Sequence, residues 1–399
     1  MNAPMPTPSV LNLRPEAEQA PSSGIVDVFN YGRNREGLIP LWVGEGDLPT
    51  PAFICEAATR SLQAGETFYT YQRGIPDLRQ AIARYCGAVY GRDIDPERFF
   101  VTAGGMHAAQ IAIRMVAGTG DEVLIPTPAW PNFAGAITVA GARPVAVPMT
   151  PDQQGWNLDL ERLAAAVTPR TRAILINSPA NPTGWTASMA ELEGILAIAR
   201  RRNLWIVADE IYNRFVFDPA LTLGTGRTPS FRDVMNDEDR VLFVQTFSKN
   251  WAMTGWRLGW LEAPPALGQV IENLVQYSTS GIPVFAQRAG IAALDEGEPF
   301  IADQIARARQ GRSIVGRLTE TGQVELPPPA GAFYAFLKVR GAGDSRQVAT
   351  RLIDEANVGL APGSAFGEGG EGYLRLCFAR KAPDLEQAVS RIAVALARG

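Results

Sequence analysis

The sequence predicts an α/β protein with two parts: a large domain built on a mainly parallel sheet with helices on both faces, and a smaller α+β domain. Between residues 99 and 263, short apolar runs alternate with helical patterns. Runs that are apolar on both faces are typical of parallel strands buried between helices. From about residue 300 the pattern changes. A chain of 399 residues is long enough for two domains.

The individual elements follow from the spacing of apolar residues. In the first part we expect strands at residues 99–104, 122–126, 143–149, 172–178, 204–210, 241–247 and 257–263. Between them, the periodicity of residues 107–118 and 189–202 predicts helices. In the second part we expect helices at residues 301–320, 346–356 and 382–397, and extended segments at 333–339, 358–363 and 373–379.

Composition and charge exclude several classes of protein. The 37 Lys and Arg residues against 41 Asp and Glu give a net charge of −4, so we expect no basic surface for nucleic acid or for a membrane. No apolar run approaches the roughly 20 residues that a membrane helix needs. Residues 1–22 are rich in Pro, lack the apolar core of a signal peptide and predict an extended arm.

One histidine, His107, and three scattered cysteines limit the chemistry further. They argue against a metal site and against Ser-His-Asp catalysis. An odd, sparse set of cysteines indicates a reducing compartment rather than a disulfide framework, so we expect a cytoplasmic protein.

The run from Thr246 to Trp260, TFSKNWAMTGWRLGW, contains the most informative lysine, Lys249. It follows an apolar strand and stands among Thr, Ser, Trp and Met rather than other charges. The alternative is a solvated surface lysine. A desolvated lysine amine has a lowered pKa, and its neutral form can hold an aldehyde cofactor as a Schiff base. With Arg257 and hydroxyl groups nearby to bind a phosphate, the run indicates pyridoxal 5′-phosphate (PLP).

Two further motifs supply groups for the ring of that cofactor. Asp209, in VADEIY, ends an apolar strand, where an unpaired carboxylate is costly. It either caps a helix or forms a salt bridge with the pyridine nitrogen, which keeps the ring protonated as an electron acceptor. Tyr212 and Asn181 would then hydrogen-bond the phenolic oxygen of the ring. The alternative for Asn181, in NSPANPTG, is an ordinary Pro/Gly loop.

A phosphate needs amides, hydroxyl groups and a cation. The motif TAGGMHAA places two glycines where a strand becomes a helix, and the free N–H groups of Gly105 and Met106 can bind an anion there. A plain tight turn is the alternative. Thr246, Ser248 and Arg257 would complete the phosphate site.

Two more residues complete the predicted site. Trp130, in PTPAWPNF, either stacks on the pyridine ring or is an ordinary core aromatic. Arg375, in YLRLCFA, lies inside an apolar strand and therefore needs a partner. That partner is either an internal acid or the α-carboxylate of a substrate, which an arginine binds through two parallel hydrogen bonds.

Together these motifs resemble the fold type I PLP-dependent aminotransferases of class I/II, in the bacterial aspartate-aminotransferase-like branch. The resemblance runs from about residue 41 to the C-terminus, through LWVGEGDLPTP, TFYTYQRGIPDLR, VTAGGMHAA, PTPAWPNF, NSPANPTG, DEIY, SKNWAMTGWRLGW and YLRLCFA. It implies a seven-stranded sheet in a large PLP-binding domain at residues 49–295. It also implies a small domain formed by residues 23–48 and 296–399, an N-terminal arm at 1–22, and a homodimer with shared active sites.

The resemblance implies a role for each matching position. Lys249 is expected to bind PLP and to carry protons, with Asp209 and Tyr212 as its catalytic partners. The expected cofactor contacts are Gly105, Met106, Trp130, Asn181, Asp209, Tyr212, Thr246, Ser248, Lys249, Arg257 and Tyr69. Of these, Tyr69 would reach the cofactor of the neighbouring subunit. The expected substrate contacts are Gly44, Asn181 and Arg375.

The implied reaction is ping-pong transamination from an L-amino acid to a 2-oxo acid, with 2-oxoglutarate or pyruvate as the expected acceptor. Three departures argue against strict aspartate specificity: Met106 where many relatives have a lysine, GEGD in place of GEPD at residues 44–47, and Trp185 after NPTG. They favour a neutral or aromatic donor.

Two alternatives to a transaminase stay open. A PLP-dependent C–S β-lyase, or a related fold type I lyase, shares the core motifs. A PLP-binding regulator would need an N-terminal DNA-binding domain, for which the about forty Pro-rich residues before the motif region are too few.

Overall fold

A computed structural model describes residues 13–18, 20–21, 24–341 and 343–397 of the chain. Most of the expected N-terminal arm lies outside these residues. Its described part contains a one-turn helix, α1 (Pro15–Glu18), where we expected extended chain. Just before α1, the Arg14 guanidinium donates a hydrogen bond to the carbonyl oxygen of Val139 at 2.7 Å. That bond ties this segment to the last residue of helix α6 (Pro131–Val139).

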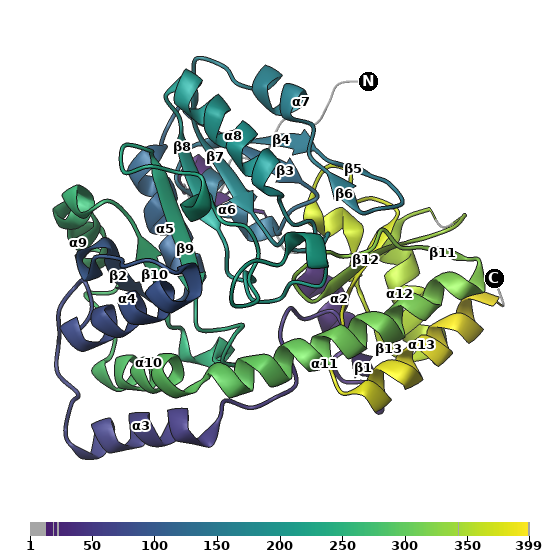
Figure 1. Cartoon of the computed structure of the whole chain (residues 1–399). Helices are drawn as coiled ribbons and strands as arrows, with labels where there is room; N and C mark the ends of the chain where they lie inside the picture. The colour runs from purple at the N-terminus through teal and green to yellow at the C-terminus, as the bar shows by residue number, and fades with distance from the viewer. Residues whose placement is uncertain (1–12, 19, 22–23, 342, 398–399) are drawn as a thin grey trace.

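The centre of the molecule is a seven-stranded sheet, as expected (Figure 1). Its strands, in spatial order, are β2 (Phe99–Thr102), β10 (Gly259–Glu262), β9 (Val241–Thr246), β8 (Trp205–Asp209), β7 (Thr171–Asn177), β3 (Glu122–Thr127) and β4 (Arg143–Pro148). Strand β10 is antiparallel to both neighbours, and the other six strands are parallel to one another. Every residue of β2, β3, β9 and β10 is buried, which explains why apolar residues dominate their sequences.

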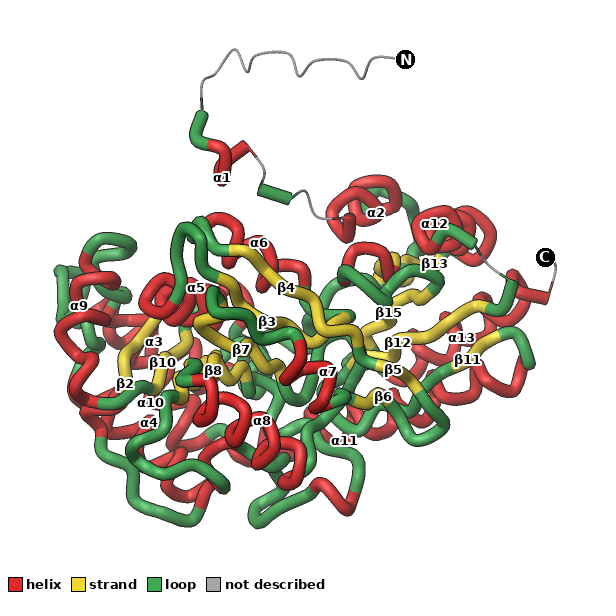
Figure 2. The backbone as a smooth tube through the Cα atoms, turned by 90° about the horizontal axis from the view of Figure 1, so that it is seen from above, coloured by secondary structure: helices red, strands yellow, loops and turns green. Residues whose placement is uncertain are grey.

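Helices cover both faces of this sheet. Helices α5 (Gly105–Val116) and α6 lie in crossovers that lead toward β4, whereas α8 (Met189–Arg202) lies in a crossover that leads the opposite way. Because parallel crossovers are right-handed, α5 and α6 cover one face and α8 the other (Figure 2). The remaining helices of this part are α3 (Ala52–Gln63), α4 (Pro76–Tyr90), α7 (Leu160–Ala165), α9 (Gly268–Gln276) and α10 (Val284–Glu296).

An antiparallel four-stranded sheet forms the second part of the molecule. Its order is β11 (Val324–Glu325), β12 (Tyr334–Val339), β15 (Tyr373–Cys377) and β14 (Ala361–Pro362). The accompanying helices are α11 (Glu298–Gly316), α12 (Ser345–Ala356) and α13 (Ala382–Ala397). A hairpin of β5 (Thr150–Pro151) and β6 (Trp156–Asn157) extends from the large sheet.

Residues near the N-terminus join this second part. Strand β1 (Ile39–Pro40) pairs in parallel with β13 (Val358–Gly359), and helix α2 (Gly24–Gly32) lies beside α12 (Figures 1 and 2). The domain boundaries given above stay predictions. Within the described stretches, no helix is both long and apolar enough to cross a membrane.

Most predicted elements differ from the structure by a few residues at their ends, and for three of them the structure shows the reason. Helix α5 begins at Gly105 rather than at residue 107, directly after Gly104 as its N-cap. Strand β10 begins at Gly259 rather than at residue 257, because Arg257 has a left-handed backbone with φ of 52°. The extended segment 358–363 divides between two sheets, since β13 pairs with β1 and β14 with β15.

Candidate active site

Polar residues gather at the carboxyl ends of the parallel strands, where ligands bind in open α/β sheets. Asn177, Asp209 and Thr246 are the last residues of β7, β8 and β9, and Lys249 follows β9 closely. A cavity of about 330 Å³ lies here, which we call the sheet-edge cavity. Its lining residues are Ile25, Val26, Phe29, Trp42, Val43, Gly44, Trp130, Asn132, Phe133, Asn177, Asn181, Ile211, Tyr212, Lys249, Tyr334 and Arg375. Six of the predicted site residues thus lie around one cavity.

Lys249 is partly buried in this cavity. Its Nζ donates a hydrogen bond to the carbonyl oxygen of Gly44 at 2.8 Å and lies 5.8 Å from the centre of the Tyr212 ring. Desolvation lowers the pKa of the Lys249 amine to about 8, so a useful fraction is neutral near physiological pH. The sequence holds two other lysines, Lys338 and Lys381, and both are exposed. The structure therefore contradicts the alternative that Lys249 is a solvated surface residue.

Asp209 is buried at the end of β8, with 3 % of its surface exposed. Burial raises the pKa of its carboxyl group to about 7, while the Ile211 N–H and the positive charge of Lys249 act in the opposite direction. Residues 211–214 form turns, so Asp209 does not cap a helix. A buried carboxyl group with a raised pKa is ionised when a cation approaches it, and a protonated pyridine nitrogen is such a cation.

Asn177 connects two predicted residues and was not predicted itself. Its Nδ2 donates to Asp209 Oδ1 at 2.9 Å, and its Oδ1 accepts from the backbone N–H of Asn181 at 2.8 Å. The signal that could have found it is its place as the polar last residue of an apolar strand, the same position that Asp209 has in β8.

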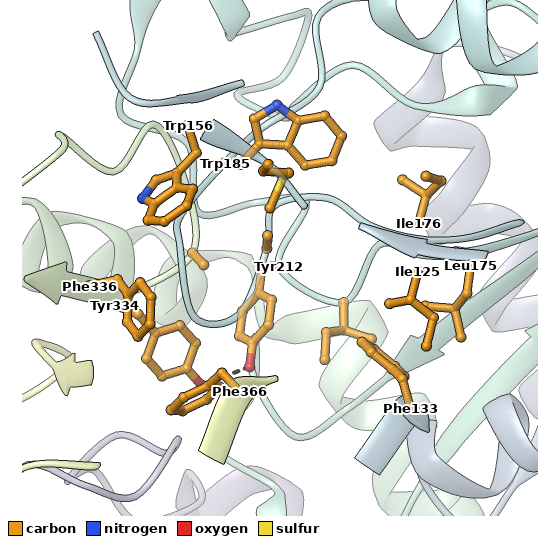
Figure 3. Packing of buried hydrophobic residues seen from close by; sticks show 14 of the residues in the cluster. Ile125, Phe133, Trp156, Leu175, Ile176, Trp185, Tyr212, Tyr334, Phe336 and Phe366 are labelled. Carbon is orange, nitrogen blue, oxygen red and sulfur yellow. Dashed lines mark hydrogen bonds between the residues drawn. The ribbon is translucent and has the colours of Figure 1, made fainter. Parts of the chain in front are cut away.

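Tyr212 is paired with a second tyrosine that we did not predict. The hydroxyl oxygens of Tyr212 and Tyr334 are 2.8 Å apart, and Figure 3 shows the two groups facing each other. Burial raises the pKa of both phenols, so both stay protonated and able to donate. Tyr334 also explains why residue 44 is a glycine, because a Cβ atom on Gly44 would lie 2.5 Å from the Tyr334 hydroxyl oxygen. Only glycine fits beside the carbonyl group that Lys249 contacts.

Arg375 on β15 is 2 % exposed. Its Nη1 donates to Asn181 Oδ1 at 3.0 Å and its Nη2 to the carbonyl oxygen of Trp42. The guanidinium lies over the Tyr334 ring, 4.8 Å from its centre, and its buried Nε has no hydrogen-bond partner in the described structure. Both observed partners are uncharged, so the alternative of an internal ion pair is wrong for the described residues. A buried, uncompensated guanidinium at a cavity suits a carboxylate ligand.

The predicted phosphate contacts surround the start of α5. Gly104 has φ of 83° and supplies no side chain to cap the helix, so the first N–H groups of α5 stay available. A Cβ atom on Gly104 would lie 2.7 Å from Nη2 of Arg257, which places that guanidinium against the turn. Thr246 Oγ1 and Ser248 Oγ are 2.9 Å apart and buried, and Thr246 lies next to Gly105. Amides, hydroxyl groups and a cation are therefore together, as a phosphate requires.

The remaining predicted contacts, Trp130, Met106 and Tyr69, do not all line the cavity. Trp130 lines the cavity and meets Phe133 edge-on, with ring centres 5.3 Å apart. The side chain of Met106 packs partly buried against the core and is not among the cavity-lining residues. Tyr69 is 94 % exposed and lies away from the cavity, in a hollow formed by residues 66–70 and 279–285.

These groups fit PLP as the ligand of the cavity. The amine of lowered pKa suits the aldehyde, the buried carboxyl group suits the ring nitrogen, and the turn before α5 suits the phosphate. The orphaned Nε of Arg375 leaves a place for a substrate carboxylate. Fold and site together define a PLP-binding enzyme of the α/β class.

Comparison with known proteins agrees with this class. The family model for aminotransferase class I and II matches residues 36–392. A protein named aspartate aminotransferase from Pyrococcus horikoshii is 35% identical over 378 residues, which cover 94% of each chain. A protein named aromatic-amino-acid aminotransferase 2 from Thermococcus litoralis is 35% identical over 380 residues, covering 94% of this chain and 96% of that one.

Solved structures show the same relationship. The crystal structure of an aspartate aminotransferase from Thermotoga maritima superposes with a TM-score of 0.88 at 33% identity, covering 96% of this chain and 99% of that chain. The chain belongs to the class I and II aminotransferase family. It is a PLP-dependent transaminase, with a 2-oxo acid as acceptor and a ping-pong reaction general to the family.

Proposed function

We propose that this protein takes the amino group of an L-amino acid with a neutral or aromatic side chain and passes it to 2-oxoglutarate or pyruvate. The observation that carries this proposal is the composition of the cavity wall. The wall contains Ile25, Val26, Phe29, Trp42, Val43 and Trp130. Lys249 and Arg375 are the only cationic side chains among the lining residues, and both are needed for the groups common to every amino acid. A second carboxylate on the donor would meet apolar surface instead of a cation.

The chain's own groups would divide the work as follows. PLP supplies an electron sink for the substrate carbanion. Lys249 would hold the cofactor through its aldehyde, and its amine would take the proton from the substrate Cα atom. Asp209 holds a proton on the ring nitrogen, and Asn181 and Tyr212 donate to the phenolic oxygen. Arg375 binds the α-carboxylate and so fixes which bond at Cα faces Lys249.

The remaining predicted residues would hold the cofactor in place. Trp130 stacks on the ring. The N–H groups of Gly105 and Met106, the hydroxyl groups of Thr246 and Ser248, and the guanidinium of Arg257 bind the phosphate. The carbonyl oxygen of Gly44 receives the Lys249 amine when it is not bound to the cofactor, at the observed 2.8 Å.

We also propose a cytoplasmic homodimer in which Tyr69 donates to the phosphate in the neighbouring subunit. Support comes from a patch of exposed aromatic side chains, Phe68, Tyr69, Tyr71 and Tyr277, which are 63% to 94% exposed in the single chain. Such a patch is typical of a protein interface. Sedimentation should detect a dimer, and Tyr69→Phe should weaken PLP binding about tenfold without changing the dimer. An active monomer would refute this arrangement.

The test of the donor class is a panel of L-amino acids without any added 2-oxo acid, so that pyridoxamine phosphate accumulates. The PLP-loaded protein is mixed with each donor in single turnover, and pyridoxamine phosphate is measured by chromatography. Leucine, methionine or phenylalanine should convert the cofactor faster than aspartate. Faster conversion by aspartate would overturn the donor class. Release of pyruvate and ammonia from a thioether amino acid would indicate the C–S β-lyase alternative instead.

A further inference from the structure

His107 is the single histidine of the chain, and the proposed mechanism gives it no role. It is 9 % exposed and lies in the first turn of α5, two residues after Gly105. Its Nδ1 accepts a hydrogen bond from the backbone N–H of Ala103 at 3.0 Å. Ala103 directly precedes Gly104, so this bond fixes the turn that would bind the phosphate.

The hydrogen-bond pattern assigns the proton of the imidazole. Because Nδ1 is an acceptor, a neutral His107 carries its proton on Nε2. Nε2 lies 2.9 Å from Ser278 Oγ and donates to it, and the Ser278 hydroxyl donates to the carbonyl oxygen of Leu274 at 2.7 Å. Burial lowers the pKa of His107, and the charge of Arg114 acts in the same direction, so the neutral form is favoured.

The position of His107 explains why an imidazole suits this turn. In a capping box, the third residue of a helix is Glu or Gln, and its side chain accepts a backbone N–H from the residue at the helix start. His107 is the third residue of α5 and accepts the N–H one position earlier. A glutamate here would place a negative charge beside a phosphate. Neutral imidazole provides the acceptor without that repulsion.

Ser278 connects His107 to the segment that lines the hollow around Tyr69. It follows α9, and the chain continues through Gly281, where an added Cβ atom would lie 3.5 Å from the carbonyl oxygen of Tyr71. Residues 279–285 line the same hollow as Tyr69. The imidazole therefore lies between the turn before α5 and the segment beside the Tyr69 loop.

We propose that His107 is a positioning residue. As the neutral Nε2–H tautomer it holds the Ala103–Gly105 turn in the shape that binds the cofactor phosphate, and it anchors that turn to Ser278. The proposal rests on the proposed function, because it requires the PLP phosphate to bind at this turn.

Nuclear magnetic resonance tests the tautomer without any substitution. With one histidine in the chain and a purification tag free of histidine, ¹⁵N-imidazole labelling gives the signals of a single residue. We expect an unprotonated Nδ1 and a protonated Nε2 at pH 7, in the presence and absence of PLP. The opposite tautomer or an imidazolium would overturn the proposal, since neither can accept the Ala103 N–H at Nδ1.

Cofactor binding tests the positioning role. His107→Leu removes both hydrogen bonds and should raise the Kd for PLP about tenfold, the effect of one lost hydrogen bond to a backbone group. Binding of pyridoxal, which lacks the phosphate, should stay unchanged. His107→Gln keeps an acceptor for Ala103 and should restore most of the affinity. Ser278→Ala, which removes only the second connection, should give a smaller loss.

The outcomes separate the possible failures. Equal losses for PLP and pyridoxal, or no recovery in His107→Gln, would overturn the positioning role. So would an unchanged Kd for PLP in His107→Leu. If the unsubstituted protein bound PLP at a lysine other than Lys249, the proposed function itself would fail, and borohydride reduction with peptide mass analysis of the unsubstituted protein would show this first.

Discussion

The polar floor of the sheet-edge cavity and the apolar wall opposite differ in how the chain builds them. The floor is built at strand ends: Asn177 and Asp209 are the last residues of β7 and β8, and Lys249 follows β9 closely. Apart from Trp130, the wall comes from α2 and the segment after β1, residues that join the second part of the molecule (Figures 1 and 2). A rigid sheet edge fixes groups that must meet a cofactor accurately, while a peripheral amphipathic helix can vary with the donor. Substitutions in the floor should stop the reaction, and substitutions in the wall should redirect it.

The largest effect is expected from Lys249→Ala. Loss of the amine removes the group that holds the cofactor and the base that takes the Cα proton, so transamination should fall by at least about 10⁴-fold. The chain has only two other lysines, which makes Lys338→Arg and Lys381→Arg matched controls that should keep full activity. Borohydride reduction followed by peptide mass analysis should find PLP on Lys249. PLP on Lys338 or Lys381 instead would show that Lys249 is not the lysine that binds the cofactor.

A smaller but still severe loss is expected from Asp209→Asn. The amide cannot hold the ring nitrogen protonated, so kcat/KM should fall by about 10²- to 10³-fold, the range for one lost electrostatic partner of developing charge. The fold should not suffer, because a buried carboxyl group of raised pKa is costly to ionise. Asp239→Asn is the control, since Asp239 is similarly buried and pairs with Arg200. Equal activity losses in both variants would mean a general effect of carboxylate removal.

The pH dependence of cofactor capture follows from the lowered pKa of Lys249. Only the neutral amine attacks the PLP aldehyde, so the capture rate of the apoprotein should rise with pH through a midpoint near 8. Ionised Asp209 stabilises the ammonium form, and Asp209→Asn should therefore move the midpoint to lower pH. Stopped-flow absorbance after mixing with PLP measures this. A midpoint near the 10.5 of an unperturbed lysine would mean that the floor does not desolvate the amine.

Much of the floor could be predicted because its chemistry follows the chain locally. Asp209 and Lys249 each come after an apolar strand, and parallel strands bring their carboxyl ends to one edge. Asn177 obeys the same rule, but it belongs to the turn-rich NSPANPTG segment, in which we singled out Asn181 alone. The seven strands themselves were predicted from their mainly apolar sequences, and only their ends were misplaced.

Apart from Trp130, the surroundings of the floor could not be predicted, because tertiary packing creates them. Tyr334 stands in the apolar strand β12 and gives no sign in the sequence that its hydroxyl meets Tyr212. Helix α2 lies more than 200 residues from Lys249 along the chain, and no local pattern connects them. Met106 was expected to influence donor choice, and its side chain packs partly buried against the core and is not among the cavity-lining residues.

The smallest effect is expected from the wall, with Val26→Arg. Val26 lines the cavity and is 50 % exposed, so a longer side chain can enter the mouth of the cavity without disturbing the core. The new guanidinium should pair with the distal carboxylate of aspartate and raise its kcat/KM, relative to that of leucine, about tenfold. Val26→Gln is the control, because it adds polarity and length without charge, and PLP affinity should be unchanged in both variants. If the aspartate-to-leucine ratio stayed the same in Val26→Arg, α2 would not contact the donor side chain, and the division between a catalytic floor and a selective wall would fail.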